Sequence, residues 1–194
     1  SMLSFKESLK ILKETDALIE GHFILSSGLH SDKYIQCAKL LSKPQKAKDL
    51  CQSLAEKIKE NFNDFNLVLS PAVGGIVIGY EIGRLLNVET IFAERVNKIF
   101  QLRRGFEIKK NHKILIVEDV ITTGKSSLEC SVLAEKLGAE IVGFASLIDR
   151  SNGKSKIDKK IISQVQIEIP TFTKDNIPEK LKKIKPIKPG SRDL

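Results

Sequence analysis

The most constraining feature of this chain is the segment 113–127, KILIVEDVITTGKSS. An apolar run at 114–117 stops at two adjacent carboxylates, Glu118 and Asp119, and a turn rich in hydroxyl groups and glycine follows at 122–127. An apolar pattern with helical spacing comes next. This order predicts a buried strand, an acidic pair at its carboxyl end, an anion-binding turn and a helix. An anion site beside carboxylates, which can serve sugar hydroxyls or Mg²⁺, suggests a phosphorylated sugar as ligand.

Two other interpretations of this segment remain open. Gly124, Lys125 and Ser126 match the end of a Walker A loop, G-x-x-x-x-G-K-[ST]. The first glycine of that motif would have to be Asp119, whose carboxylate would repel the phosphates that the loop surrounds. The other interpretation is a strand, an acidic turn and a helix with no ligand. The hydroxyl-rich turn attached to the acidic pair favours a ligand site over both.

Length and composition favour one α/β domain with appendages. The chain has 194 residues, and its 41% hydrophobic content supports a packed core. No apolar run approaches the roughly 20 residues of a membrane helix, and the N-terminus, with Ser1 as a cloning remnant, predicts an amphipathic helix instead of a signal peptide. The cysteines and histidines lack metal-ligand spacing. We therefore expect a cytoplasmic protein.

The chain is basic, with a formal net charge of +8. Such a charge is typical of a solvated basic surface, and it also attracts polyanionic small molecules or nucleic acid. Many of the cations lie in the last forty residues, where the lysines at 180–188 have no aromatic residues between them. Stacking on nucleic acid bases is therefore poorly supported, and we expect small anions as ligands.

Hydrophobic periodicity predicts alternating strands and helices. Strands are expected at 66–70, 89–94, 113–118, 140–150 and 161–169, and helices after Ser4, from Pro44, after the glycine turn at 71–75 and after the turn at 122–127. Strands that alternate with helices over 44–150 predict a mostly parallel sheet. Ligands of such sheets bind at the carboxyl ends of the strands.

The chemically informative residues all follow predicted strands. They are Pro71–Gly75, Glu94–Arg95, Glu118–Ser126 and Asp149–Arg150. Because the carboxyl ends of parallel strands lie at one edge of the sheet, we expect these residues to form one shared site.

The block VEDVITTGKS resembles the phosphoribosyl diphosphate (PRPP) motif of the type I phosphoribosyltransferases. The wider chain resembles the branch of that family that acts on orotate. The supporting segments are GHFILSSGLHSDKYIQ, PAVGGIVIG, FAER with LRRGF, LIDR and IKPGSR. The resemblance implies a single phosphoribosyltransferase domain over 1–194, with a mostly parallel core at about 44–150 and a small hood from about 1–43 and 151–194.

The same resemblance implies an activity. Ribose 5-phosphate would pass from PRPP to N1 of orotate, giving orotidine 5′-monophosphate and pyrophosphate in pyrimidine (UMP) biosynthesis. Mg²⁺ would be the cofactor, held mainly by PRPP and water, so that no protein ligand is named. The implied assembly is a homodimer that shares a basic loop across its interface, with neither nucleic acid nor membrane as a partner.

Roles can be assigned to individual residues from the resemblance. The catalytic residues would be Lys98, Glu118 and Asp119. The PRPP site would comprise Arg95, Lys98, Glu118, Asp119, Val120, Ile121, Thr122, Thr123, Gly124, Lys125 and Ser126. Backbone amides of Ala72, Val73, Gly74 and Gly75 would face the pyrophosphate. Orotate would contact Thr122, Arg150 and Tyr34.

Each of these motifs also has an interpretation in which it binds no ligand. The turn at 71–75 is also typical of a plain strand-to-helix connection, and the stretch 95–104, expected to be a mobile lid, could be a solvated basic loop. Arg150 could pair with Asp149 at the surface instead of holding a substrate carboxylate.

Three positions depart from the family pattern. Ser26 stands where many relatives carry a base-contacting lysine, Phe100 stands near the place of a loop histidine, and Glu118 replaces a frequent aspartate. The first two leave the base contacts and the loop catalyst open.

Two further functions compete with the orotate reaction. The first is transfer to a purine or another base, against which Arg150 and the segment LSSGLHS argue. The second is a PRPP-sensing regulator that binds nucleic acid, which the net charge of +8 motivates. Fold alone does not separate these functions, so the site residues must do so.

Overall fold

The centre of the molecule is a six-stranded sheet with the order β5-β4-β3-β6-β7-β8. A computed structural model describes residues 2–190. The strands are β3 (Leu67–Pro71), β4 (Glu89–Val96), β5 (Ile99–Leu102), β6 (Lys113–Ile121), β7 (Glu140–Asp149) and β8 (Ile161–Gln166). All neighbours are parallel except β4 and β5, which form an antiparallel hairpin at one edge. The predicted mostly parallel sheet is confirmed.

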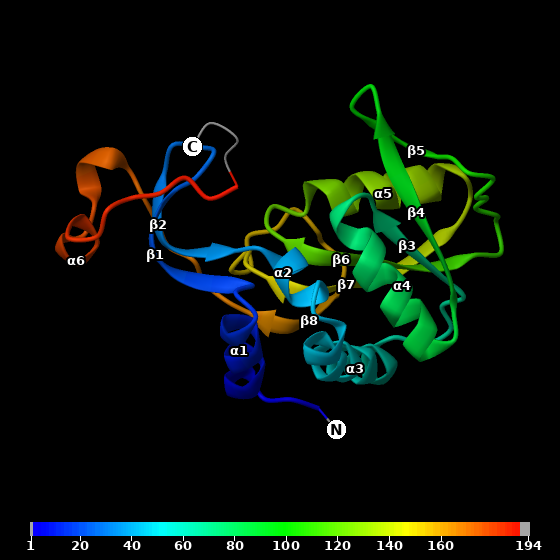
Figure 1. The fold of residues 1–194 in the computed structure, drawn as a ribbon. Helices are drawn as coiled ribbons and strands as arrows, with labels where there is room; N and C mark the ends of the chain where they lie inside the picture. The colour runs from blue at the N-terminus through cyan, green and yellow to red at the C-terminus, as the bar shows by residue number, and fades with distance from the viewer. Residues whose placement is uncertain (1, 191–194) are drawn as a thin grey trace.

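Helices cover both faces of this sheet (Figure 1). They are α1 (Phe5–Glu14), α2 (Cys37–Leu41), α3 (Pro44–Asn61), α4 (Gly74–Leu86) and α5 (Lys125–Lys136). Side chains alternate along each strand, so Val68 and Leu115 lie in the same core cluster as α3 and α4, whereas their neighbours Leu67 and Ile114 lie in the cluster that α5 covers. The apolar runs on β3 and β6 are therefore continuous because their side chains are buried on both faces of the sheet.

A second, smaller sheet stands apart from the core and forms the hood (Figure 1). It consists of β1 (Leu18–Ile24), β2 (His30–Ile35) and β9 (Thr171–Phe172), with the short helices η1 (Lys174–Asn176) and α6 (Glu179–Lys182) beside it. The chain after α6 returns to β1, where the Ile187 N–H donates to the His22 carbonyl at 3.0 Å and the Ile24 N–H donates to the Ile187 carbonyl at 2.8 Å. Both ends of the chain therefore build the hood.

The helix starts follow the local sequence signals. Ser4 caps α1 in a capping box with Glu7, in which each side chain accepts a hydrogen bond from the other residue's backbone N–H. Pro44 opens α3, where its fixed φ and missing N–H cost nothing. Both predicted starts are confirmed.

The core extends beyond the expected range 44–150. β8 pairs in parallel with β7, and Leu12 of α1 and Leu40 of α2 are buried in the main core cluster. An amphipathic helix must bury its apolar face, and α3 offers the adjoining surface to both short helices. The expected motif IKPGSR ends in Ser191 and Arg192, which lie outside the described residues. Among residues 2–190, no helix is long and apolar enough to cross a membrane.

Candidate active site

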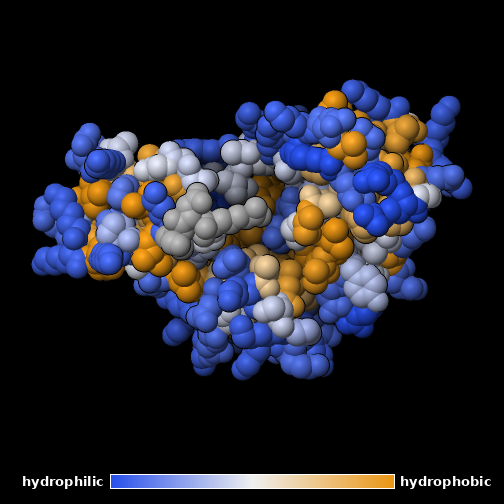
Figure 2. Space-filling model, turned by 45° about the horizontal axis from the view of Figure 1, so that its top comes forward, coloured by the Kyte–Doolittle hydropathy of each residue, from blue (hydrophilic) through white to orange (hydrophobic). Residues whose placement is uncertain are grey.

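The carboxyl ends of β3, β4, β6 and β7 meet at one edge of the sheet, as predicted. Pro71 pairs with Ala93 at the ends of β3 and β4, and Ile121 pairs with Asp149 at the ends of β6 and β7. The Arg150 N–H then donates to the Ile121 carbonyl at 2.9 Å, which ties the two later loops together. Figure 2 shows a hollow in the surface between the hood and the core.

The acidic pair lies inside β6 and not at its end, which corrects the predicted strand boundary. β6 continues to Ile121 because β7 pairs with it that far, whereas its pairing with β3 stops at Leu69 and Ile116. The β3 side of β6 is therefore free of a strand beside Glu118 and Asp119. The glycine turn after β3 occupies that side.

The glycine turn at 71–75 approaches the two carboxylates closely. A β-carbon on Gly74 would lie 3.0 Å from Asp119 Oδ1, and one on Gly75 would lie 3.1 Å from Glu118 Oε1. Any larger residue would crowd the acidic pair, so this close approach explains both glycines. α4 begins at Gly74, so the positive end of its dipole lies beside the carboxylates. The peptide bond between Ala72 and Val73 is cis.

Burial makes the acidic pair electrostatically costly. Glu118 is 9% exposed, and burial followed by the charge of Asp119 raises its pKa to about 9. Burial also raises the pKa of Asp119. Within residues 2–190, their oxygens accept hydrogen bonds from two backbone N–H groups: Val120 donates to Asp119 Oδ1 at 2.8 Å, and Asp119 donates to Glu118 Oε1 at 3.2 Å. Hydroxyl donors or positive charge at this place would relieve that cost.

The turn at 122–126 has the geometry of an anion cradle. Gly124 has φ +85°, a left-handed conformation that favours glycine, and its β-carbon would lie 2.9 Å from Ile157 Cγ1. α5 begins at the next residue, so its first N–H groups and its dipole face this turn. The Lys156 N–H donates to the Thr123 carbonyl at 2.9 Å and fixes the turn from outside.

The basic stretch 95–104 forms the β4–β5 hairpin, with Asn97 and Lys98 at its tip in left-handed conformations. A loop was expected here, but the alternation in IFQL lets β5 pair with β4. Lys98 is exposed, and among residues 2–190 no carboxylate lies within ion-pair distance of it or of Arg103. These two cations are therefore available to an anionic ligand.

Two cations of the same hairpin have carboxylate partners. Arg95 Nη1 lies 2.6 Å from Glu129 Oε2, and its Nη2 donates to Ser126 Oγ at 3.2 Å. Arg104 Nε lies 2.7 Å from Glu94 Oε2, and this contact lowers the pKa of Glu94. Arg95 thus joins the hairpin to the anion cradle, while Arg104 only closes the hairpin on itself. The spacing of Lys125 and Glu129, four residues apart on α5, predicts only their own pair at 4.0 Å and not the pairing of Glu129 with Arg95.

Arg150 is half-buried at the same edge of the sheet. Asp149 is not within ion-pair distance of its guanidinium; Asp149 Oδ1 instead accepts a hydrogen bond from the Ser151 N–H at 2.8 Å. No carboxylate in the described part of the chain lies within ion-pair distance of the Arg150 guanidinium, and burial lowers its pKa. A half-buried guanidinium without a protein anion is typical of a site for a ligand anion.

Tyr34 lies in the hood, on β2. Its ring packs on Phe23 of β1 with 5.8 Å between centroids. Tyr34 therefore belongs to the hood sheet and not to the carboxyl edge of the core sheet. Ser26 lies in the turn between β1 and β2. The structure therefore brings the glycine turn, the acidic pair, the anion cradle and Arg150 to one edge of the core sheet, joins Arg95 to the cradle, and leaves Tyr34 apart from them in the hood.

Comparison with known proteins agrees with this geometry. Residues 39–183 match the model of the phosphoribosyl transferase domain family. An orotate phosphoribosyltransferase of Carboxydothermus hydrogenoformans is 44% identical over 183 residues, covering 94% of this chain and 96% of the relative. Another, from Parvibaculum lavamentivorans, is 46% identical over 189 residues, covering 95% and 97%.

Solved structures share the fold. The crystal structure of an orotate phosphoribosyltransferase from Aeropyrum pernix superposes with a TM-score of 0.71 at 22% identity, covering 81% of this chain and 92% of that one. An adenine phosphoribosyltransferase from Thermoanaerobacter pseudethanolicus gives 0.59 at 19% identity, covering 70% and 88%. The family match over most of the chain and the near full-length relatives show that this chain is a pentosyltransferase that belongs to the phosphoribosyltransferase family, among the orotate phosphoribosyltransferases.

Proposed function

We propose that this chain transfers ribose 5-phosphate from PRPP to N1 of orotate. The C1–O bond to pyrophosphate breaks, a C1–N1 bond forms, and the N1 proton is lost, which gives orotidine 5′-monophosphate and pyrophosphate. The names of the relatives support this reaction. The observation that carries it is the half-buried Arg150 without a carboxylate partner, at the sheet edge that holds the acidic pair and the anion cradle.

The 5′-phosphate of PRPP would bind at the turn 122–126. Three features of the turn support this binding: the left-handed conformation of Gly124, the hydroxyl groups of Thr122 and Thr123, and the positive end of α5. The ribose hydroxyls would then donate to Glu118 and Asp119. Two buried carboxylates favour the positive charge that develops on the ribose as the C1–O bond breaks, and such preorganised charge is a large term in catalysis.

The pyrophosphate would lie between the glycine turn and the basic hairpin. Residues 72–75 contribute backbone N–H groups at the start of α4, and Lys98 and Arg103 contribute positive charge to the departing group. Closure of the hairpin would exclude water, which would otherwise hydrolyse PRPP.

The donor set at this edge fits a Mg²⁺ ion that PRPP carries with it. Glu118 and Asp119 are hard oxygen donors that point toward the glycine turn, and residues 2–190 contain no group of three or more metal-binding side chains. Two carboxylates suit an ion that keeps most of its water and phosphate ligands. When bound, Mg²⁺ would neutralise charge on the pyrophosphate oxygens. The chain's own residues would position the substrate around it.

Orotate would bind between the core and the hood. Its carboxylate would pair with Arg150, whose planar guanidinium suits a carboxylate bidentately. Thr122 would contact the ring from the core side, and Tyr34 would form the wall on the hood side. A neutral purine offers no anion to Arg150, so the site favours orotate.

We also propose a homodimer in the cytoplasm, acting in pyrimidine (UMP) biosynthesis. An apolar patch at the start of α4 supports the dimer, because Val73, just before the helix, and Val77 and Tyr80 on it are 82%, 54% and 65% exposed. The patch lies beside the glycine turn, so a partner there would bring its basic hairpin near this site. All three cysteines are buried and free, which suits a reducing compartment.

Loss of orotate absorbance in the presence of PRPP and Mg²⁺ tests the proposal, with adenine, hypoxanthine and uracil as parallel substrates. We expect turnover of orotate alone, abolished by a chelator. Arg150→Gln should raise the KM for orotate by about 10- to 100-fold, which is the range for a lost charged hydrogen bond. Arg84→Gln is the matched control, because Arg84 is an exposed arginine paired with Glu81 away from the site.

Other outcomes separate the competing functions. Turnover of a purine without turnover of orotate would keep the PRPP site and overturn the role of Arg150. Salt-sensitive binding of RNA without turnover of any base would favour the regulator.

A further inference from the structure

A groove whose apolar walls have no part in the proposed reaction lies between β5 and the outer face of α5. It has a volume of about 380 Å³, within the range of small-molecule sites. Its apolar walls come from Ile99, Phe100, Leu128, Val132 and Leu133. Ile99 is 66% exposed and Val132 is 45% exposed, so this apolar surface is open to a ligand.

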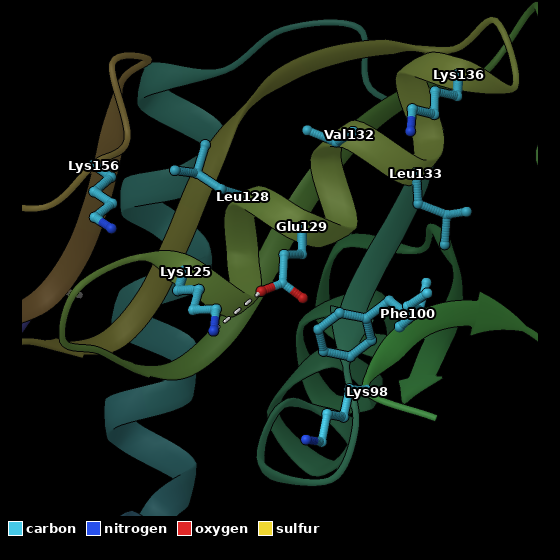
Figure 3. Close-up of a pocket in the computed structure, with 10 residues that line it drawn as sticks. Lys98, Phe100, Lys125, Leu128, Glu129, Val132, Leu133, Lys136 and Lys156 are labelled. Carbon is cyan, nitrogen blue, oxygen red and sulfur yellow. Dashed lines mark ion pairs between the residues drawn. The ribbon is translucent and has the colours of Figure 1, made fainter. Parts of the chain in front are cut away.

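Four lysines surround these apolar walls: Lys98, Lys125, Lys136 and Lys156. Figure 3 shows Phe100 between Lys98 and Leu133, with Lys125 and Lys136 at opposite ends of α5. The helix has 12 residues, so these two lysines mark the ends of a groove about 16 Å long.

The charge around the groove is not balanced by the protein. Among the described residues that line it, Glu129 is the one acidic residue, and it already contacts Arg95 at 2.6 Å and Lys125 at 4.0 Å. Within the chain as described, Lys98, Lys136 and Lys156 have no carboxylate at ion-pair distance. A ligand that satisfies this groove therefore carries an anionic group on an apolar body.

We propose that the groove binds a small amphipathic anion, with an aliphatic or aromatic body against Val132 and Phe100 and a phosphate, sulfonate or carboxylate group among the lysines. The groove also adjoins the anion cradle. Lys98 and Lys125 line the groove and belong to the candidate PRPP site, and the Lys156 N–H holds the Thr123 carbonyl. A bound anion draws the two shared lysines away from PRPP, so the two ligands weaken each other. This coupling rests on the proposed function, whereas the binding does not.

Fluorescence of anilinonaphthalene sulfonate, an aromatic anion, reports binding directly. We expect saturable binding to the whole protein, displaced by octyl phosphate but neither by octanol nor by inorganic phosphate. Val132→Asp and Lys136→Glu should each weaken binding at least tenfold. Lys48→Glu, which makes the same charge change at an exposed site on α3, should leave it within twofold.

Three other results would refute the proposed anion site. Equal binding to the parent and to both groove variants would place the probe elsewhere. Displacement by octanol as strong as by octyl phosphate would remove the charge argument. If the probe does not bind and Val132→Asp dissociates a dimer, the groove is an interface between two copies of the chain and not a small-molecule site.

The coupling has its own readout. Saturating PRPP should weaken the binding of anilinonaphthalene sulfonate by about five- to tenfold, and by linkage the probe should weaken PRPP by the same factor. Unchanged affinities would refute the coupling alone. Failure of PRPP to bind at all would refute the proposed function and leave the anion groove standing.

Discussion

Replacement of Asp119 by Asn should stabilise the protein while it lowers its activity. The variant keeps the shape of the side chain, and its Oδ1 still accepts the Val120 N–H that now lies 2.8 Å away. It removes one of two adjacent buried charges. Because Glu118 and Asp119 both have raised pKa values, the folded protein without ligand holds them at a cost.

Two causes raise the pKa of Glu118: burial first and the charge of Asp119 second. Relief of such buried charge by a neutral side chain of the same shape is typically worth roughly 1–3 kcal/mol of unfolding free energy. For a chain of this length, that corresponds to a rise in Tm of roughly 2–12 °C. Turnover should fall about 100-fold, the range for one lost electrostatic contact to a transition state.

The increase in unfolding free energy caused by Asp119→Asn must also depend on pH. A folded pKa above the unfolded one gives stability that is present below the unfolded value and is lost as pH rises toward the folded value. For Glu118 this loss runs from pH 4.5 to about 9. Thermal unfolding should therefore show little difference between variant and parent at pH 4.5 and the full difference at pH 9. A variant less stable than its parent at both pH values would show that Asp119 has a structural role, and the reasoning would be wrong.

Three further predictions concern the hairpin, the anion cradle and the hood. Lys98→Gln should lower turnover at least tenfold with Tm unchanged; full turnover would eliminate Lys98 as the loop catalyst. Gly124→Ala should lose about 1–3 kcal/mol of stability and all protection by PRPP, whereas Gly153→Ala, at φ +72° with open space around it, should lose only the backbone part. In the hood, buried His22 and His30 share a 2.6 Å hydrogen bond. Burial and His22 lower the pKa of His30, so hydrogen exchange of the hood should accelerate as pH falls below about 6.5, and an unchanged rate would refute this.

The sequence predicted the core sheet well because each strand carries its own signal. The runs at 67–69 and 114–117 are buried on both faces of the sheet, and every residue of each run is apolar. The prediction of one shared edge followed from parallel strands alone. It placed Glu118, Gly124 and Arg150 together without any knowledge of distances.

The rest depended on contacts between distant segments. The hood joins β1 to residues near 187 through two backbone hydrogen bonds, and backbone pairing leaves little trace in side-chain pattern. Nor does the sequence pattern show that the side chain of Ile157, thirty-three positions later, lies against Gly124. The pairing of Arg95 with Glu129 decides which hairpin cations stay available, and it required the fold to be known.

A crystal structure of the protein with orotate, Mg²⁺ and an unreactive PRPP analogue would test the account most directly. We expect the 5′-phosphate in the turn 122–126, the ribose hydroxyls on Glu118 and Asp119, and the orotate carboxylate on Arg150. A carboxylate bound elsewhere, with Arg150 facing solvent or a protein anion, would contradict it.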